Sequence, residues 1–187
     1  MIDAAEALFL EQGYEQTPLS AVVQRSGGSL ATLYENFGNK QGLLRAVMTG
    51  LKEDNTVPIP GDPTDDKSCS DQLKDYAHAL YAHLMTPRAI ALKRIVMTEA
   101  LRDPCFAKGL YEDLHLSAVD ELAQSFRKWT DMGCAEIDDA DAAADLFFAM
   151  IISDAQMRFM CMKDDTALTD PELDWRLAPF LSHFKIG

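Results

Sequence analysis

The chain has 187 residues, of which 48% are hydrophobic and 25% are charged, and its 17 basic and 30 acidic side chains give a formal net charge of −13 at pH 7. This apolar content excludes an intrinsically disordered chain, and the longest apolar run, residues 146–152, is far shorter than the roughly 18 residues of a membrane-spanning helix. Asp3 and Glu6 stand where a secretory signal would be basic, so we expect a soluble, cytoplasmic protein with no membrane partner.

The spacing of the cysteines and the absence of catalytic motifs argue against metal, cofactor and enzyme chemistry. The four cysteines, at positions 69, 105, 134 and 161, form no CxxC pair, which is typical of reduced thiols and not of a disulfide framework. The sequence contains no HExxH, GxSxG, GxGxxG or P-loop motif. We therefore expect no cofactor, no metal site and no enzyme activity.

Helix signals recur along the chain and strand signals are nearly absent, which predicts an all-α fold. Residues 54–66, DNTVPIPGDPTDD, contain three prolines and a glycine and cannot form a helix. This segment predicts a linker between an N-terminal head (1–53) and a larger helical body (67–187). Residues 1–52 carry four basic and five acidic side chains, so the body holds nearly all of the negative charge.

The head has the pattern of a helix-turn-helix. A first helix has an apolar stripe, Ile2, Ala5, Leu8 and Phe9, and stops at Gly13. Thr17 as N-cap and Pro18 as first residue predict a second helix over 18–26, which ends at the glycine pair 27–28. Ser29 can cap a third helix that reaches residue 36 or 37. Two short helices joined by a tight glycine turn and packed on a preceding helix are typical of DNA-binding proteins.

The third helix has small and hydroxyl side chains on its outer face. Leu33 and Phe37 are expected to face the core, whereas Ser29, Ala31, Thr32 and Glu35 face outward. Such side chains allow a close approach to base edges and thymine methyl groups. Asn39 is a good cap for a fourth helix through Leu51, which places Lys40 at a helix start, where a bound phosphate is favourable. A solvated surface lysine is an equally good explanation of Lys40.

Residues 2–47 resemble the DNA-binding region of the TetR/AcrR family of bacterial transcriptional regulators. The matching elements, in order, are Ala4-Ala5, Leu8-Phe9, Gly13-Tyr14, Thr17, Ser26-Gly27, Thr32-Leu33-Tyr34, Phe37, Asn39-Lys40 and Leu43-Leu44. The resemblance implies nine or ten helices, a homodimer, and repression of a promoter that a small ligand relieves. It assigns contacts with a double-stranded DNA operator to Thr17, Ser29, Leu30, Ala31, Thr32, Tyr34 and Lys40.

Two features depart from the family pattern. Leu30 replaces a basic residue or proline, which indicates an apolar base contact or partial burial. Family members carry a basic arm before the first helix, yet nothing basic precedes Arg25, so either the arm lies outside this sequence or affinity is lower. The net charge of −13 does not itself exclude DNA binding, because charges are screened over about 8 Å at ~0.15 M salt.

Helix start and stop signals in the body predict five helices, over 67–85, 87–102, 109–132, 138–162 and 171–184. Thirteen of the seventeen residues in 146–162 are apolar, and Asp154 and Arg158 stand one turn apart and can pair. A helix apolar nearly all round must be covered on several sides, by a second subunit or within one subunit. The predicted dimer face comprises Phe148, Ile151, Ile152, Ala155, Phe159, Leu173, Leu177, Phe180, Leu181 and Phe184.

The body is also expected to hold a pocket for an apolar or aromatic effector of unknown identity. Its predicted lining comprises Tyr76, Leu80, His83, Met97, Tyr111, His115, Phe126, Trp129, Phe147 and Met150. Residues 81–111 resemble, less specifically than the head, the C-terminal domains of AcrR-like and AefR-like family members.

Two functions remain open from the sequence. The first is a ligand-responsive, dimeric DNA-binding regulator, most simply a repressor. The alternative is an all-α small-molecule-binding or protein-interaction module without effective DNA binding, which the acidity and the absence of basic residues before Arg25 favour.

Overall fold

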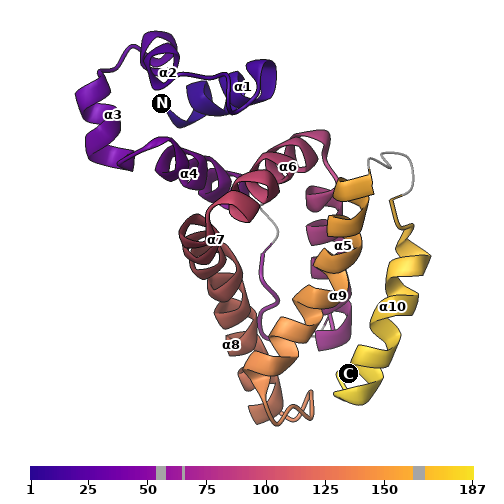
Figure 1. The fold of residues 1–187 in the computed structure, drawn as a ribbon. Helices are drawn as coiled ribbons and strands as arrows, with labels where there is room; N and C mark the ends of the chain where they lie inside the picture. The colour runs from indigo at the N-terminus through magenta and orange to yellow at the C-terminus, as the bar shows by residue number, and fades with distance from the viewer. Residues whose placement is uncertain (54–57, 65, 162–166) are drawn as a thin grey trace. The chain divides into compact units, whose positions relative to one another are not determined.

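The computed structural model describes residues 1–53, 58–64, 66–161 and 167–187, with the side chains of Glu53, Phe159 and Cys161 also outside the description. The helices are α1 (Ile2–Gln12), α2 (Leu19–Ser26), α3 (Leu30–Phe37), α4 (Lys40–Glu53), α5 (Cys69–Leu84), α6 (Pro87–Arg102), α7 (Pro104–Leu110), the π-helix η1 (Tyr111–Leu116), α8 (Ser117–Asp131), α9 (Ala140–Cys161) and α10 (Asp170–His183), labelled in Figure 1.

The predicted all-α class is confirmed. Over the described ranges, β-type pairing is limited to an isolated bridge between Thr64 and Lys67. None of the helices described has both the length and the sustained apolarity that crossing a bilayer requires.

The chain divides into two compact units. The first unit comprises Met1–Asn55 and Arg88–Leu114, and the second comprises Thr56–Pro87 and His115–Gly187. The sequence pattern assigns residues 67–187 to the body, whereas residues 88–114 group with the head in the structure. A shared apolar core explains the grouping, and ion pairs add to it. Arg88 bonds Glu6 of α1 at 2.5 Å, Arg102 bonds Glu15 in the α1–α2 loop, and Arg45 of α4 bonds Asp113.

In the first unit, α1 packs against α2 and α4, and α3 packs against α2 and α4. Their buried side chains include Leu8, Phe9, Val22, Leu33 and Leu44, and side chains of α6 and α7 complete the same core. The predicted stop of the first helix is confirmed, because Gly13 follows α1 with φ of +87°, a value that favours glycine.

The predicted helix over 109–132 is wrong at its start. The helix begins at Pro104, continues through the π-helical turn of η1 and ends at Asp131. The Asp103 carboxylate caps this start by accepting bonds from the backbone N–H groups of Cys105 and Phe106 at 2.9 and 3.1 Å. Asp103-Pro104 is thus a start signal as well as the end of α6, since proline suits the first helical position.

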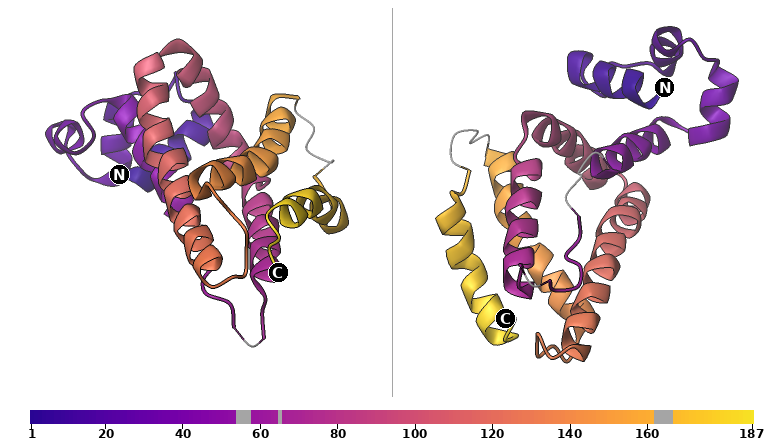
Figure 2. Two further views of the ribbon diagram at one scale, coloured as in Figure 1. Left: turned by 90° about the horizontal axis from the view of Figure 1, so that it is seen from below. Right: turned by 180° about the vertical axis from the view of Figure 1, so that it is seen from behind.

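In the second unit, α9 packs against α8 and α5, and α5 also packs against α10 (Figure 2). Tyr76 of α5 stacks on Phe147 of α9 with ring centroids 5.9 Å apart, which places an aromatic cluster at this junction. The described part of the proline-rich segment is docked on α8. Ser125 Oγ donates to the Pro60 carbonyl at 2.5 Å and Trp129 Nε1 donates to the Gly61 carbonyl at 2.8 Å.

Candidate DNA interface

The turn between α2 and α3 has the predicted glycine geometry. α2 ends at Ser26, and Gly27 adopts the left-handed conformation with φ of +74° while its N–H donates to the Val23 carbonyl at 3.0 Å. A residue with a Cβ atom is strained at such a φ, so glycine permits the chain to reverse within two residues. The start of α3 is thereby fixed relative to α2.

α3 is capped and oriented as the sequence predicts. The Ser29 hydroxyl accepts a hydrogen bond from the Thr32 N–H at 3.1 Å, and the two hydroxyl groups lie 2.9 Å apart. Leu33 has no exposed surface, whereas Ala31, Thr32 and Glu35 are exposed. Leu30 is 43% exposed and Tyr34 is 53% exposed, so an apolar and a phenolic side chain extend the same outer surface. Contact of this surface with DNA remains a prediction.

Thr17 is buried, which corrects two expectations. Its hydroxyl donates to the Gly13 carbonyl at 2.8 Å and lies 3.2 Å from the Leu8 carbonyl, with no exposed surface left on the residue. The hydroxyl therefore does not cap α2, whose N-cap is Pro18, and it is not available to a phosphate. Thr17 instead ties the α1–α2 loop to the end of α1.

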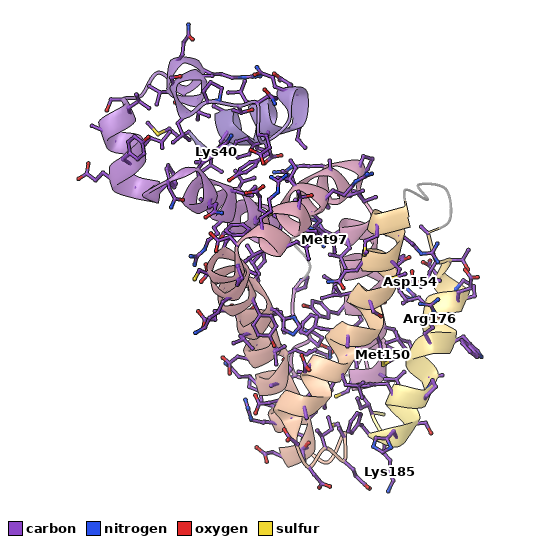
Figure 3. All side chains as sticks on the ribbon, viewed as in Figure 1. Lys40, Met97, Met150, Asp154, Arg176 and Lys185 are labelled. Carbon is purple, nitrogen blue, oxygen red and sulfur yellow. The ribbon has the colours of Figure 1, made fainter. Side chains whose placement is uncertain are left out.

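Asn39 caps α4, as predicted, by accepting a bond from the Gly42 N–H at 2.8 Å. Lys40 is the first residue of α4, again as predicted, but its ammonium group points back toward the α1–α2 loop (Figure 3). It donates to the Glu15 carbonyl at 3.2 Å and lies 4.5 Å from the centroid of the Tyr14 ring. Burial lowers the pKa of Lys40, against the opposing effect of the Glu15 and Glu99 carboxylates.

Gly42 fixes the approach of α4 to α3. A Cβ atom on this residue would lie 1.9 Å from the backbone oxygen of Phe37, far inside any permitted contact. The absence of a side chain at position 42 therefore sets the tight turn that places Lys40 beside the end of α3.

The surface around α2 and α3 is mostly neutral. Arg25, at the end of α2, donates to both carboxylate oxygens of Glu11 at 2.6 and 2.8 Å, and this pairing lowers the pKa of Glu11. The guanidinium is thus neutralised within the protein. Beside the exposed Glu35, serine, threonine, tyrosine and backbone groups remain to meet a duplex, and such groups position or read DNA without adding positive charge.

The predicted pocket residues fall in both units. Tyr76, Phe126, Trp129 and Phe147 are buried in the second unit; Leu80, His83, His115 and Met150 of that unit are partly exposed (Figure 3 labels Met150). Met97 and Tyr111 belong to the first unit, and Tyr111 is 51% exposed. Burial raises the pKa of Tyr76 to about 12, as does the nearby Glu121 carboxylate. The pocket remains a prediction.

Most of the predicted dimer face lies in the core of one protomer. Its buried members are Phe148, Ile151, Ala155, Leu173, Leu177 and Phe180. Ile152, Leu181 and Phe184 are partly exposed, and the Phe159 side chain lies outside the described residues. The first six side chains are already covered by the chain's own helices, so they are not free to meet a partner.

The opposite face of the same helices carries exposed apolar side chains that sequence reasoning missed. We define the exposed α9–α10 face as Leu146, Met157 and Met160 of α9 and Trp175 of α10, which are 48%, 59%, 67% and 77% exposed. Between these helices, Asp154 accepts bonds from Arg158 at 2.5 Å, as predicted, and forms an ion pair with Arg176 at 3.0 Å (Figure 3). The signal for this face was the position of Trp175, which lies off the apolar stripe formed by Leu173, Leu177 and Phe180.

Comparisons with known proteins cover both parts of the chain. Residues 1–47 match the sequence profile described as bacterial regulatory proteins of the tetR family. Residues 71–178 match the profile of the C-terminal domain of AefR-like transcriptional repressors.

Individual proteins that are similar to this chain are also transcriptional regulators. The chain is 47% identical to the HTH-type transcriptional repressor ComR of Escherichia coli (strain K12) over 47 residues, which are 25% of this chain and 22% of ComR. A putative TetR-family regulator from Mesorhizobium loti has a TM-score of 0.77 and 24% identity, with 98% of this chain and 94% of that one covered. The flavonoid-responsive regulator FrrA has a TM-score of 0.74 and 27% identity, with 97% and 93% covered. Matches to the curated relatives ComR and UidR span 22% and 63% of those proteins' lengths.

Proposed function

The chain belongs to the TetR family of bacterial transcriptional regulators, and from this premise we propose that it represses a promoter as a homodimer bound to a pseudo-palindromic operator. The observation that carries the proposal is the α2–α3 pair: a left-handed glycine hinge, a capped α3, and an outer surface of Ser29, Ala31, Thr32 and Tyr34 above a buried Leu33. Two such helices about 34 Å apart meet successive major-groove faces of a duplex.

The proposed contacts divide into two kinds. Tyr34 of α3 and Lys40, at the start of α4, are proposed to meet phosphates, which position a protein without reading sequence. Thr32 and Ala31, near the start of α3, are proposed to meet base edges and thymine methyl groups. Because Lys40 already bonds Glu15 and faces the Tyr14 ring, its ammonium offers a phosphate a single defined position.

A gel shift with the DNA upstream of the protein's own gene tests this function. We expect a complex whose affinity falls with salt, and we expect Tyr34→Ala with Lys40→Ala to weaken binding to all sequences alike. Thr32→Ala should alter sequence preference instead. Lys108→Ala, a highly exposed lysine on α7, is the matched control. Failure to bind any upstream DNA at low salt would favour the ligand-binding module without DNA binding.

We further propose that the exposed α9–α10 face is the dimer interface. Large exposed apolar side chains on both α9 and α10, with Trp175 77% exposed, are typical of surfaces that a partner covers. A second copy is the partner that fits, since a twofold axis would pair this face with itself and give two operator-reading heads. Sedimentation velocity over a range of concentrations measures the association.

The effector is proposed to be a flat aromatic compound. The second unit concentrates Tyr76, Phe126, Trp129, Phe147 and Phe148, and aromatic side chains suit aromatic ligands. The similarity to FrrA, whose name describes a flavonoid-responsive regulator, points to the same chemical class. A flavonoid series added to the protein–operator complex should release the DNA and raise the melting temperature of the free protein.

A further inference from the structure

Two cysteines that are distant in the sequence are held together in the second unit. Cys69 is the first residue of α5 and Cys134 lies in the connection between α8 and α9, and the Cys134 thiol is near enough to raise the pKa of the Cys69 thiol. Both are free thiols. Sixty-four residues lie between them in the chain, so only the fold brings them together.

The backbone around the pair is fixed from both sides. Gly187 donates its N–H to the Cys134 carbonyl at 3.1 Å, and its own carbonyl accepts a bond from the Ser70 N–H at 3.1 Å. One residue therefore bridges the neighbour of Cys69 to Cys134. The Cys134 N–H is also bonded, to the Trp129 carbonyl at 2.8 Å, and the Ser68 hydroxyl caps α5 at the Asp71 N–H.

We infer that Cys69 and Cys134 form an oxidation site, in which a peroxide or a small disulfide-forming oxidant converts the two thiols into an intrachain disulfide. Proximity is the reason: the Gly187 bridge holds the two cysteines near each other, so their thiols react at a high effective concentration, whereas unconnected thiols need a chance encounter. Such a bond would covalently join the start of α5 to the α8–α9 connection.

The two sulfurs have different roles in the reaction with hydrogen peroxide. Cys134 is partly exposed, so its thiolate attacks a peroxide oxygen, the O–O bond breaks, and hydroxide leaves to give a sulfenic acid. Cys69 is 1% exposed and its sulfur then attacks the Cys134 sulfur, which breaks the S–O bond. Its proton leaves with the hydroxide as water. The balance is two thiols and one peroxide giving one disulfide and two waters.

The environment of Cys69 keeps its thiol protonated. Burial raises the pKa of the Cys69 thiol to about 12, and the neighbouring Cys134 thiol and Asp62 carboxylate act in the same direction. A protonated thiol is a poor nucleophile, so Cys69 is not the sulfur that meets the oxidant. Its proton must leave as it attacks the Cys134 sulfenic acid.

Peptide mapping of the full chain after treatment with hydrogen peroxide or diamide tests the site. Trypsin places Cys69 in residues 68–74, Cys105 in 103–108, Cys134 in 129–158 and Cys161 in 159–163, so each thiol reports separately. We expect a crosslink between 68–74 and 129–158, the loss of two of four titratable thiols, and reversal by dithiothreitol. In urea the same treatment should give mixed pairings, because proximity is lost.

The double variant Cys105→Ser with Cys161→Ser retains both sulfurs of the proposed site and should form the disulfide at the wild-type rate. Cys134→Ser should abolish the crosslink, and circular dichroism checks that the variant is folded. The oxidised wild type should melt a few degrees higher than the reduced protein, because the closed loop restricts the unfolded chain. Crosslinks only to Cys105 or Cys161, only between chains, or none in the folded double variant would overturn the inference.

Discussion

The ammonium of Lys40 lies 4.5 Å from the centroid of the Tyr14 ring and 3.2 Å from the Glu15 carbonyl oxygen. Tyr14 in turn packs edge-on against Phe9, with centroids 5.0 Å apart, so the ring is anchored in the core of the first unit. A cation above an aromatic face is attracted by its quadrupole. The charge at the start of α4 therefore has a defined position beside α3 before any DNA arrives.

Removing this charge should weaken DNA binding without changing sequence preference. Lys40→Met keeps an apolar stem of similar length and deletes only the ammonium. We expect affinity for operator and non-operator duplexes to fall alike, and the slope of log affinity against log salt to decrease by about 1, since one phosphate contact is lost. Fluorescence anisotropy at several salt concentrations measures both. An unchanged slope, or an equal loss in Lys108→Met, would contradict the phosphate role.

Gly42→Ala should disrupt the α3–α4 turn. The added Cβ would lie 1.9 Å from the Phe37 oxygen, and backbone at both ends must move to relieve the clash. We expect a loss of more than about 2 kcal/mol of unfolding free energy, or a displaced α3 with no DNA binding. Gly50→Ala, on the same helix with open space around the new Cβ, is the control and should stabilise by up to ~1 kcal/mol. Urea unfolding compares the two variants.

The Ser29 cap gives a way to separate stability from DNA contact. Ser29→Ala removes the oxygen that accepts the Thr32 N–H, and we expect it to cost about 1 kcal/mol of unfolding free energy. Ser29→Asp restores an acceptor at the cap, so its stability should return to near that of the wild type, while its carboxylate repels phosphate. Equal DNA affinity in Ser29→Asp and wild type would exclude position 29 from the interface.

The sequence was informative where local chemistry decides the structure. Ser29, Asn39 and the 27–28 glycines set helix ends through their own backbone and side-chain bonds, so the α2–α3–α4 geometry was predictable from spacing. The position of the Thr17 side chain was not predictable, because a threonine before a proline can cap a helix or turn inward. Only the packing against α1 determines which of the two occurs.

In the body, the sequence does not determine which side chains are buried. α9 is apolar nearly all round, and nothing in such a helix says which side its neighbours cover. The structure buries Phe148, Ile151 and Ala155 inside the protomer and leaves Met157 and Met160 exposed. Likewise, residues 88–114 join the first unit through contacts between distant residues: Arg88 and Arg102 pair with carboxylates of the head, and Arg45 of the head pairs with Asp113.

The proposed dimer should be sensitive to charge on the exposed α9–α10 face. Trp175→Asp or Met157→Asp would bring a carboxylate into an apolar interface, where it loses hydration without gaining a partner. We expect the dimer dissociation constant to rise at least tenfold with little change in helix content. Leu101→Asp is the matched control, because Leu101 is 89% exposed on α6. Sedimentation velocity that gives wild-type association for both α9–α10 variants would remove this face from the interface.

The carboxylate of Asp154 should make a pH-dependent contribution to the stability of the second unit. Burial alone would raise the pKa of Asp154, but hydrogen bonds from Arg158, Tyr81 and Arg176 outweigh it and hold the pKa below its ordinary value. Tyr81 donates at 2.9 Å while its oxygen accepts from the Leu168 N–H at 3.1 Å, so the carboxylate also fixes the residues just before α10.

Because the pKa of Asp154 is lower in the folded state than in the unfolded state, the unfolded chain takes up its proton first as the pH falls. The stabilisation is complete above the ordinary value of about 4 and is lost as the pH drops through the lower folded pKa. Asp154→Asn should therefore cost about 2 kcal/mol at pH 7, by leaving two guanidinium groups without their counter-charge, and less near pH 3. Urea unfolding at both pH values, beside Asp120→Asn on the exposed surface of α8, measures the difference. A cost that is the same at both pH values would mean that Asp154 acts through packing alone.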